Sequence, residues 1–169
     1  MSETTATGGW EDLARAASYQ GMGEEEGGAE LLRELLAFEL AHSPYAIPVE
    51  RVREIVRVRE MTRVPRVPDW VRGVVTLRGE VVQVIDLRMR LGLEATEPGR
   101  RSRIVVLHGD DERITGVLVD AVREVMRVAE DAFSASEEGE VGAVSELCLQ
   151  EGEFVSVIDV DRVLELRAD

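Results

Sequence analysis

The chain has 169 residues, enough for one compact domain or for two small units that share a core. Its net charge of −14 argues against nucleic acid as the main ligand, and its single cysteine, Cys148, excludes an intramolecular disulfide and is read as a buried, inert thiol. No apolar run reaches membrane-spanning length and the start lacks a secretion-signal pattern, so we expect a soluble cytoplasmic protein.

The first 33 residues form an acidic N-terminal extension. Gly21 to Gly28 has the composition of a flexible linker, and we expect the extension to be disordered. One short amphipathic patch within it is either a docking peptide or part of an idle tail, and it consists of Trp10, Leu13, Ala14 and Ala17.

Alternating apolar residues predict three strands in the next stretch, at Leu36 to His42, Tyr45 to Val49 and Val52 to Val58. Leu31 to Leu36 is open between a helical turn and the approach to a strand. Strict alternation in the third strand puts Glu54 on one face with Val52, Val56 and Val58. A carboxylate on such a face costs free energy unless a cation pairs with it, which predicts an arginine partner for Glu54.

A β-hairpin is predicted after a proline-rich connector. Its strands are Val71 to Leu77 and Val81 to Ile85, and the chain reverses at Arg78-Gly79-Glu80. The second strand is apolar on nearly both faces, so we expect it inside a sheet rather than at an edge. Asp86 then follows as the N-cap of a short helix that ends at Gly92.

The second half of the chain is also predicted to be mainly β-strand. The loop Ser134 to Glu140 is polar and acidic, and Asp159 is placed to cap a closing helix that reaches Leu166. The expected strands are Arg103 to Leu107, Arg113 to Val119, Val122 to Val128, Val141 to Leu149 and Phe154 to Ile158.

Two blocks of sequence recur in the same order. Gly79 to Leu87 reappears 73 positions later as Gly152 to Val160, and Val52 to Val58 reappears 70 positions later as Val122 to Val128. This repeat predicts two similar β units packed about a pseudo-twofold axis. Glu151 stands in the second copy where Arg78 stands in the first, so Arg78 needs a local explanation, which is either a function or simple solvation of a surface arginine.

No catalytic or metal-binding pattern is present. His42 and His108 each lack Cys or His neighbours at metal-ligand spacing, and no phosphate-binding loop or nucleophile motif occurs. Asp86 and Asp159 suggest a carboxylate pair, but their position before helical patterns favours capping. We therefore expect no catalytic residues, no metal site and no cofactor, and a protein that is not an enzyme.

Residues 36 to 166 resemble the CheW family, the adaptors that couple chemoreceptors to the chemotaxis histidine kinase CheA. The most specific part of the resemblance is Gly73 to Gly79, read GVVTLRG, followed by Val84 to Arg88, read VIDLR. Further matching segments are Phe38-Glu39-Leu40, Tyr45 to Pro48, Val52 to Ile55, Val64 to Pro68 and Gly116 to Asp120 with Val122 and Val125.

The resemblance implies an all-β fold with short helices, in which two five-stranded SH3-like barrels share a core across residues 34 to 169. It also implies two protein-binding surfaces and a salt bridge from Glu54 to Arg78. The regulatory domain of a CheA-type kinase is expected on Ile55, Gly73 and Gly79. The cytoplasmic tip of a chemoreceptor is expected in the groove between the barrels, near Val52, Glu54, Arg78, Val122 and Val125.

This sequence departs from the family in two places, which are the extension 1 to 33 and an acidic, proline-free loop after Val128. The contacts expected of the second barrel are less well supported for that reason. The departures also allow for a specialised chemosensory array rather than a swimming system.

Two other classes of function compete with this adaptor. A barrel could bind single-stranded nucleic acid through residues 51 to 90, which hold ten arginines and five acidic residues. Few aromatic residues and the acidic remainder argue against that alternative, and filter binding over a salt titration would test it. An enzyme would need a metal or phosphate site that the sequence does not contain, and metal analysis of the purified protein would test for one.

Overall fold

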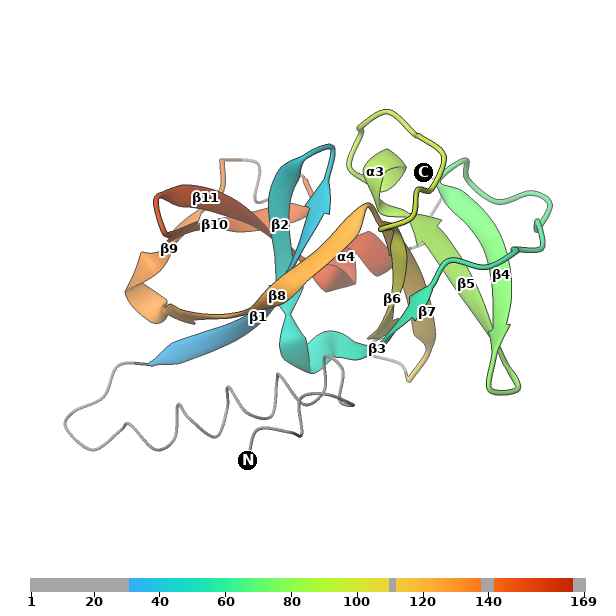
Figure 1. Ribbon diagram of the computed structural model, residues 1–169, viewed down its shortest axis with the longest axis horizontal. Coiled ribbons are helices and arrows are strands. Elements are labelled where there is room, and N and C mark those ends of the chain that lie inside the picture. Colours follow the sequence, from blue (N-terminus) through green and yellow to red (C-terminus); the bar gives the residue numbers. More distant parts are fainter. Residues whose placement is uncertain (1–30, 110–111, 138–141, 166–169) are drawn as a thin grey trace.

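The computed structural model describes residues 31–109, 112–137 and 142–165. They form two strongly curved β-sheets that lie side by side (Figure 1), with short helices between and beside them. The amphipathic patch around Trp10 and the last residues of the predicted closing helix lie outside the described part of the chain.

The first sheet has six strands in the order β8-β1-β2-β11-β10-β9. The predicted barrel had five strands, and the additional one is the three-residue β9, which pairs with β10 and overlaps the first two residues of the loop predicted from Ser134 to Glu140. The strands are β1 (Leu32–Leu40), β2 (Ser43–Pro48), β8 (Ala121–Ala129), β9 (Phe133–Ala135), β10 (Val144–Gln150) and β11 (Glu153–Ile158). The sequence left Leu31 to Leu36 open between a helical turn and the approach to a strand. The structure shows that this stretch is strand from Leu32 onward.

The second sheet has five strands in the order β3-β6-β7-β5-β4. They are β3 (Val52–Arg57), β4 (Val71–Leu77), β5 (Glu80–Asp86), β6 (Arg103–His108) and β7 (Ile114–Val119). The strand β5 lies between β4 and β7, as its apolar faces predicted. The short helices are η1 (Val49–Arg51), α3 (Leu87–Arg90), η2 (Glu130–Ala132) and α4 (Val160–Leu164).

Five strands of the larger sheet correspond in order to the five strands of the smaller one, in agreement with the sequence repeat, and β9 has no counterpart. β3 and β8 begin the two orders, and the hairpins β4–β5 and β10–β11 occupy equivalent places. Each sheet contains one parallel pair, β5 with β7 and β11 with β2. The C-terminal repeat supplies too few strands for its own sheet, which is completed by the hairpin β1–β2 from the start of the described chain.

Three apolar clusters hold the sheets. The largest takes residues from both sheets and from α4, including Phe38, Ile85, Leu107 and Val163. A second cluster fills the six-stranded sheet and contains Cys148, which is fully buried. Burial raises the pKa of the Cys148 thiol above its ordinary value. The third cluster fills the five-stranded sheet and is built mainly of valines.

Each of the two short α-helices forms an ion pair with a segment of chain that passes from one sheet to the other. The Nη2 of Arg88, in α3, lies 2.8 Å from Oδ2 of Asp120, which joins β7 to β8. At the equivalent helical position Asp161, in α4, lies 2.8 Å from Nη2 of Arg51, between β2 and β3. Both copies of the repeat therefore have an ion pair at this helical position, but the helix supplies the arginine in one copy and the acid in the other. Asp120 also accepts a 2.7 Å hydrogen bond from the backbone N–H of Ala41, so it links both sheets.

We expect the contribution of Asp120 to stability to disappear in acid. Burial alone raises the pKa of Asp120, but hydrogen bonds from Arg88 and from the Ala41 N–H lower it below the ordinary 3.8. A lowered folded-state pKa stabilises the protein above the unfolded value, and this stabilisation is lost as the pH falls through the folded value. Asp120→Asn should lower the free energy of unfolding by about 1 to 2 kcal/mol at pH 7. Urea titrations at pH 7 and pH 3 should show that difference shrinking, and a constant difference would contradict it.

Candidate functional site

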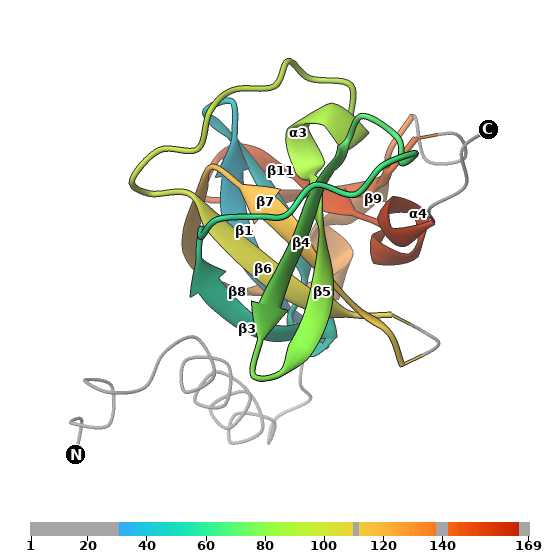
Figure 2. The same cartoon turned by 90° about the vertical axis from the view of Figure 1, so that its right-hand side faces the viewer.

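The hairpin β4–β5 turns through two residues, and this turn places Arg78 at its tip. Leu77 pairs directly with Glu80, which leaves Arg78 and Gly79 as the loop. Their φ angles of 51° and 84° are those of a type I′ turn, which matches the twist of the flanking strands. Figure 2 shows the tip projecting beyond the rest of the five-stranded sheet. The Arg78 side chain is 76% exposed there.

Glu54 has the arginine partner that its strand face required. Its Oε1 lies 3.1 Å from Nη2 of Arg78, and its own side chain is only 14% exposed. Val56, two residues further along β3, packs against the valine-rich cluster of the five-stranded sheet. The carboxylate therefore lies on the inner face of that sheet and is neutralised from the hairpin tip.

A second ion pair joins β3 to the hairpin β4–β5, and in this pair β3 supplies the arginine and the hairpin supplies the acid. Nη1 of Arg53 lies 3.1 Å from Oε1 of Glu80, so each element contributes one acid and one arginine. β3 and β4 stand at opposite ends of the sheet order and are not paired with each other. The two ion pairs therefore link β3 to the hairpin β4–β5, although no strand pairing joins β3 to β4.

The apolar residues expected to bind the receptor lie at the cluster shared by the two sheets, with Val52 on the other face of β3 and Val122 and Val125 on β8. Val52, Ile55, Val122 and Val125 all belong to or pack against the cluster shared by the two sheets. Placing Val52 beside Glu54 was wrong, because a register shift between Val52 and Glu54 inserts Arg53 and moves Val52 to the face of Ile55. Val52 is buried, whereas the other three are partly exposed. Ile55, expected at the kinase surface, thus lies with the receptor set.

The two glycines expected at the kinase surface have different environments. Gly73 is buried at a φ of 147°, and a Cβ there would lie 2.4 Å from the carbonyl oxygen of Thr62. Thr62 and Val74 exchange two backbone hydrogen bonds of 2.9 and 2.8 Å, which hold the connector 58–70 against β4. Gly79 is exposed, and a Cβ there would meet nothing within 4 Å.

Sequence reasoning found the helix cap at Asp86 but missed its partner. Oδ1 of Asp86 accepts the Met89 N–H at 3.3 Å, as predicted for an N-cap, and Asp159 caps α4 in the same way. The Oδ2 of Asp86 is buried without a hydrogen bond, and Nη1 of Arg72 lies 3.4 Å from it. A register shift between Val71 and Gly73 makes Arg72 the extra residue of a β-bulge in β4, and no local signal connects it with Asp86.

We expect Arg72→Gln to be strongly destabilising. Removing one partner of a buried ion pair leaves an uncompensated charge, which costs about 3 kcal/mol or more. Urea unfolding should show this loss, and Asp86→Asn in the same chain should recover part of it because the amide oxygen can still cap α3. An Arg72→Gln protein as stable as its parent would show that the 3.4 Å contact contributes nothing.

Metal chemistry finds no support in the described residues. Within residues 31–109, 112–137 and 142–165, no group of three His, Cys, Asp or Glu side chains could hold a metal ion. In that same part of the chain no helix is long and apolar enough to cross a membrane.

Comparison with known proteins agrees with the strand arrangement. A model of the CheW-like domain matches residues 34–168. Chemotaxis protein CheW of Bacillus subtilis is 33% identical over 135 residues, which cover 78% of this chain and 86% of that protein. The CheW protein of Helicobacter pylori is 32% identical over 69% of this chain and 70% of its own length, and that of Rhizobium meliloti is 38% identical over 58% and 63%.

The fold has a counterpart among solved structures. The crystal structure of scaffolding protein TtCheW from Thermoanaerobacter tengcongensis superposes with a TM-score of 0.75, covers 82% of this chain and 97% of that one, and is 24% identical. At this level of identity the match establishes the fold. The two curved sheets with their short helices are therefore the CheW architecture.

Proposed function

The chain belongs to the CheW family, and from this membership we propose that it is a non-enzymatic adaptor that couples chemoreceptors to a CheA-type histidine kinase. Its relatives are named chemotaxis proteins, and the chain of similar fold is named a scaffolding protein. Such an adaptor acts in the cytoplasm, recruited to receptor arrays, and transmits receptor state by positioning the kinase rather than by making bonds.

The observation that carries this proposal is the geometry of Arg78. A guanidinium that is 76% exposed, fixed at a rigid turn and held by one carboxylate, has most of its donors available to a partner. We assign Arg78 and Glu54 to the receptor-binding surface together with Val122 and Val125. Val52 is buried, so its role there is to support the partly exposed neighbours by packing.

The proposed kinase surface uses the connector side of the five-stranded sheet. Gly73 fixes the close approach of the connector to β4, and Gly79 fixes the hairpin turn. Ile55 was expected at the kinase surface but packs against the same cluster as Val122 and Val125, so we expect substitutions there to affect both partners. Gly73 differs from Ile55, because we expect substitutions at Gly73 to affect kinase binding alone.

Reconstitution tests the adaptor directly. The purified chain is added to a CheA-type kinase and to membranes that contain the receptor, and kinase autophosphorylation is measured with and without attractant. We expect attractant-sensitive kinase activity only when all three proteins are present. An adaptor that binds neither protein, or kinase control that is complete without it, would contradict the proposal.

The structure gives little support to nucleic-acid binding. Five of the ten arginines in residues 51–90 pair with carboxylates of the protein itself. A sixth, Arg90, donates to the backbone carbonyls at the end of α4 and lies over the Trp70 ring. These side chains neutralise the protein's own acids and helix end rather than lining a groove for phosphates.

A further inference from the structure

The hairpin β10–β11 carries a pair of exposed apolar side chains. Leu149 and Phe154 stand opposite each other across its two strands, and they are 47% and 61% exposed. Directly opposed side chains on one face of a sheet contact each other, so the two form one apolar patch. Their sequence neighbours Cys148 and Val155 are buried in the cluster inside the six-stranded sheet. Because side chains alternate along a strand, Leu149 and Phe154 lie on the outer face of that sheet.

The patch continues into a groove of about 680 Å³. Leu147 and Ser156, the next opposed pair on the outer face of the hairpin, line this groove together with Tyr45 of β2. Its apolar lining also includes Leu91 and Leu93, which follow α3. Successive side chains on one face of a strand lie about 7 Å apart, so the patch and the groove form one apolar stripe at least about 10 Å long. We call it the hairpin stripe.

The hairpin stripe is separate from both surfaces of the proposed adaptor. The receptor set includes Val122 and Val125 on β8, and three strands stand between β8 and β10 in the sheet order. Of those strands, β1 and β2 bury Leu36, Phe38 and Ile47 in the cluster shared by the two sheets. The proposed kinase surface lies on the five-stranded sheet. The stripe is therefore a third surface, beyond the function proposed above.

The sequence repeat shows that the fold does not require this patch. The hairpin β4–β5 has the same two-residue turn, and Thr76 and Val81 occupy the places of Leu149 and Phe154 there. Val81 is 68% exposed, but it stands opposite a threonine rather than a leucine. Two large exposed apolar side chains opposite each other are thus a property of the second repeat alone. Contiguous exposed apolar surface of this kind is typical of protein interaction sites.

Acidic side chains surround the hairpin stripe. Residues 130–153 hold eight acidic residues and no basic residue. Glu137 lines the groove and is exposed, and Glu153 is 53% exposed although Nη1 of Arg123 lies 3.6 Å from its Oε1. Arg90 also lines the groove, but its guanidinium donates to backbone carbonyls of α4. The electrostatic field at the stripe therefore favours a positively charged partner.

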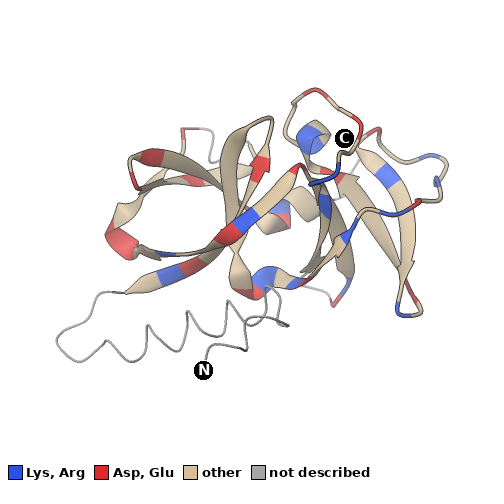
Figure 3. Cartoon of the chain, in the orientation of Figure 1, with Lys and Arg blue, Asp and Glu red and all other residues tan. Residues whose placement is uncertain are grey.

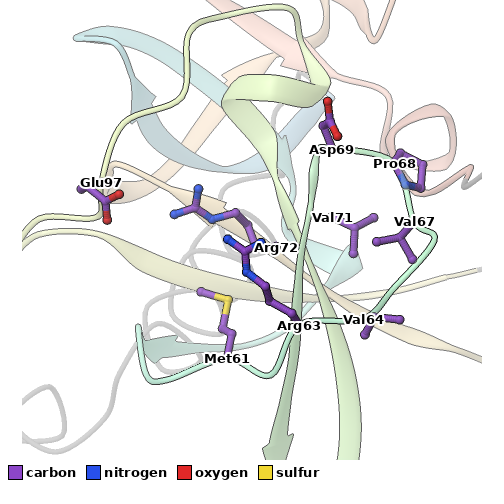
Figure 4. A pocket seen from close by; sticks show the side chains of 9 residues that line it. All are labelled: Met61, Arg63, Val64, Val67, Pro68, Asp69, Val71, Arg72 and Glu97. Atoms are coloured by element: carbon purple, nitrogen blue, oxygen red, sulfur yellow. The ribbon is translucent and has the colours of Figure 1, made fainter.

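The first repeat has the opposite character. Figure 3 shows blue segments along the connector 58–70, whereas red segments mark η2 and the hairpin β10–β11. Arg63 and Arg72 extend into the pocket between the connector and β4 (Figure 4). A partner whose charge suits the basic connector is therefore repelled by the hairpin stripe, and the converse also holds.

We propose that the hairpin stripe is a docking surface for a basic amphipathic helix of another protein. A helix with apolar side chains at positions i, i+3 or i+4, and i+7 presents an apolar stripe about 10 Å long, which matches the patch and the groove. Lysine or arginine side chains on its flanks then face the carboxylates around the stripe. The N-terminal segment of this chain, with seven acidic residues and one arginine in residues 1–30, carries the wrong charge for this position.

A synthetic helix tests the chemistry of the occupant. A blocked peptide of about 14 residues, with leucines at helical spacing and lysines between them, is titrated into the full chain at low salt. The backbone amide resonances of residues 144–156 are followed by NMR. One comparison peptide has glutamate in place of every lysine, and the other has the same composition with its leucines redistributed around the helix.

We expect the lysine peptide to shift the resonances of residues 144–156 and to bind at least about tenfold more tightly than either comparison peptide. Leu149→Thr with Phe154→Val, which gives the hairpin the side chains of the first repeat, should weaken binding at least about fivefold. Glu137→Gln lies outside both strands of the hairpin and should weaken binding at least about twofold at low salt.

Val81→Thr is the matched control, because it removes a similarly exposed apolar side chain from the equivalent position of β4–β5, and we expect it to leave peptide affinity unchanged. Equal binding of the glutamate peptide, shifts confined to the five-stranded sheet, or equal losses in Val81→Thr and in the double variant would overturn the proposal. A dimer in sedimentation equilibrium that the double variant abolishes would also overturn it, because a second copy would then cover the stripe.

Discussion

Replacing Arg78 with alanine is expected to abolish receptor-dependent control of the kinase while leaving the fold intact. The side chain is 76% exposed and makes one 3.1 Å contact with Glu54, and such exposed ion pairs contribute about 0.2 to 1 kcal/mol. The turn conformation already requires a positive φ, so alanine adds no strain that arginine lacks. We expect urea unfolding within about 1 kcal/mol of the parent, normal kinase binding, and kinase activity that no longer responds to attractant.

The sequence repeat supplies the control for this experiment. Glu151 occupies the same turn position in the hairpin β10–β11, with a φ of 54° against 51° for Arg78. Glu151→Ala therefore tests a loss of charge at the same backbone geometry, and we expect it to preserve kinase control. Kinase control that survives Arg78→Ala would show that the role assigned to Arg78 is wrong. Equal losses in both variants would point to the turns rather than to the arginine.

The features that sequence predicted well depend on short spans of chain or on the repeat. The helix caps at Asp86 and Asp159 depend on hydrogen bonds between residues that are only three positions apart in the sequence. The two hairpin turns follow from glycines at equivalent positions, and the structure gives Gly79 and Gly152 nearly equal φ angles of 84° and 81°. The cation near Glu54 was predictable because a carboxylate on an apolar strand face costs free energy unless a cation neutralises it.

The features that sequence missed depend on register or on distant contacts. Strict alternation along β3 assigned Val52 to the wrong face, because the residue inserted at Arg53 reverses the pattern and leaves no mark in the composition. The pairing of Arg72 with Asp86 joins neighbouring strands of a hairpin whose register also shifts, between Val71 and Gly73. Ile55 likewise joined the receptor set only once both sheets were in place.

Gly73→Ala is expected to have the largest effect of any single methyl group in the proposed kinase surface. The φ of 147° is rarely adopted by residues with a side chain, and the added Cβ would lie 2.4 Å from the Thr62 carbonyl oxygen. Backbone strain and overpacking each cost about 1 to 3 kcal/mol, so the free energy of unfolding should fall by about 3 kcal/mol or more. The connector must move away from β4, and we expect kinase affinity to fall at least about tenfold.

Gly79→Ala separates this steric clash from the general cost of a positive φ. Gly79 has a φ of 84° but open space around it, so alanine there should cost only about 1 kcal/mol. Urea unfolding and kinase titration of both variants give the comparison. If the connector carries the kinase surface, loss of affinity in Gly73→Ala should accompany altered amide resonances at Thr62 and Val74, whose mutual hydrogen bonds are broken. Full kinase affinity in a folded Gly73→Ala protein with a displaced connector would remove Gly73 from that surface.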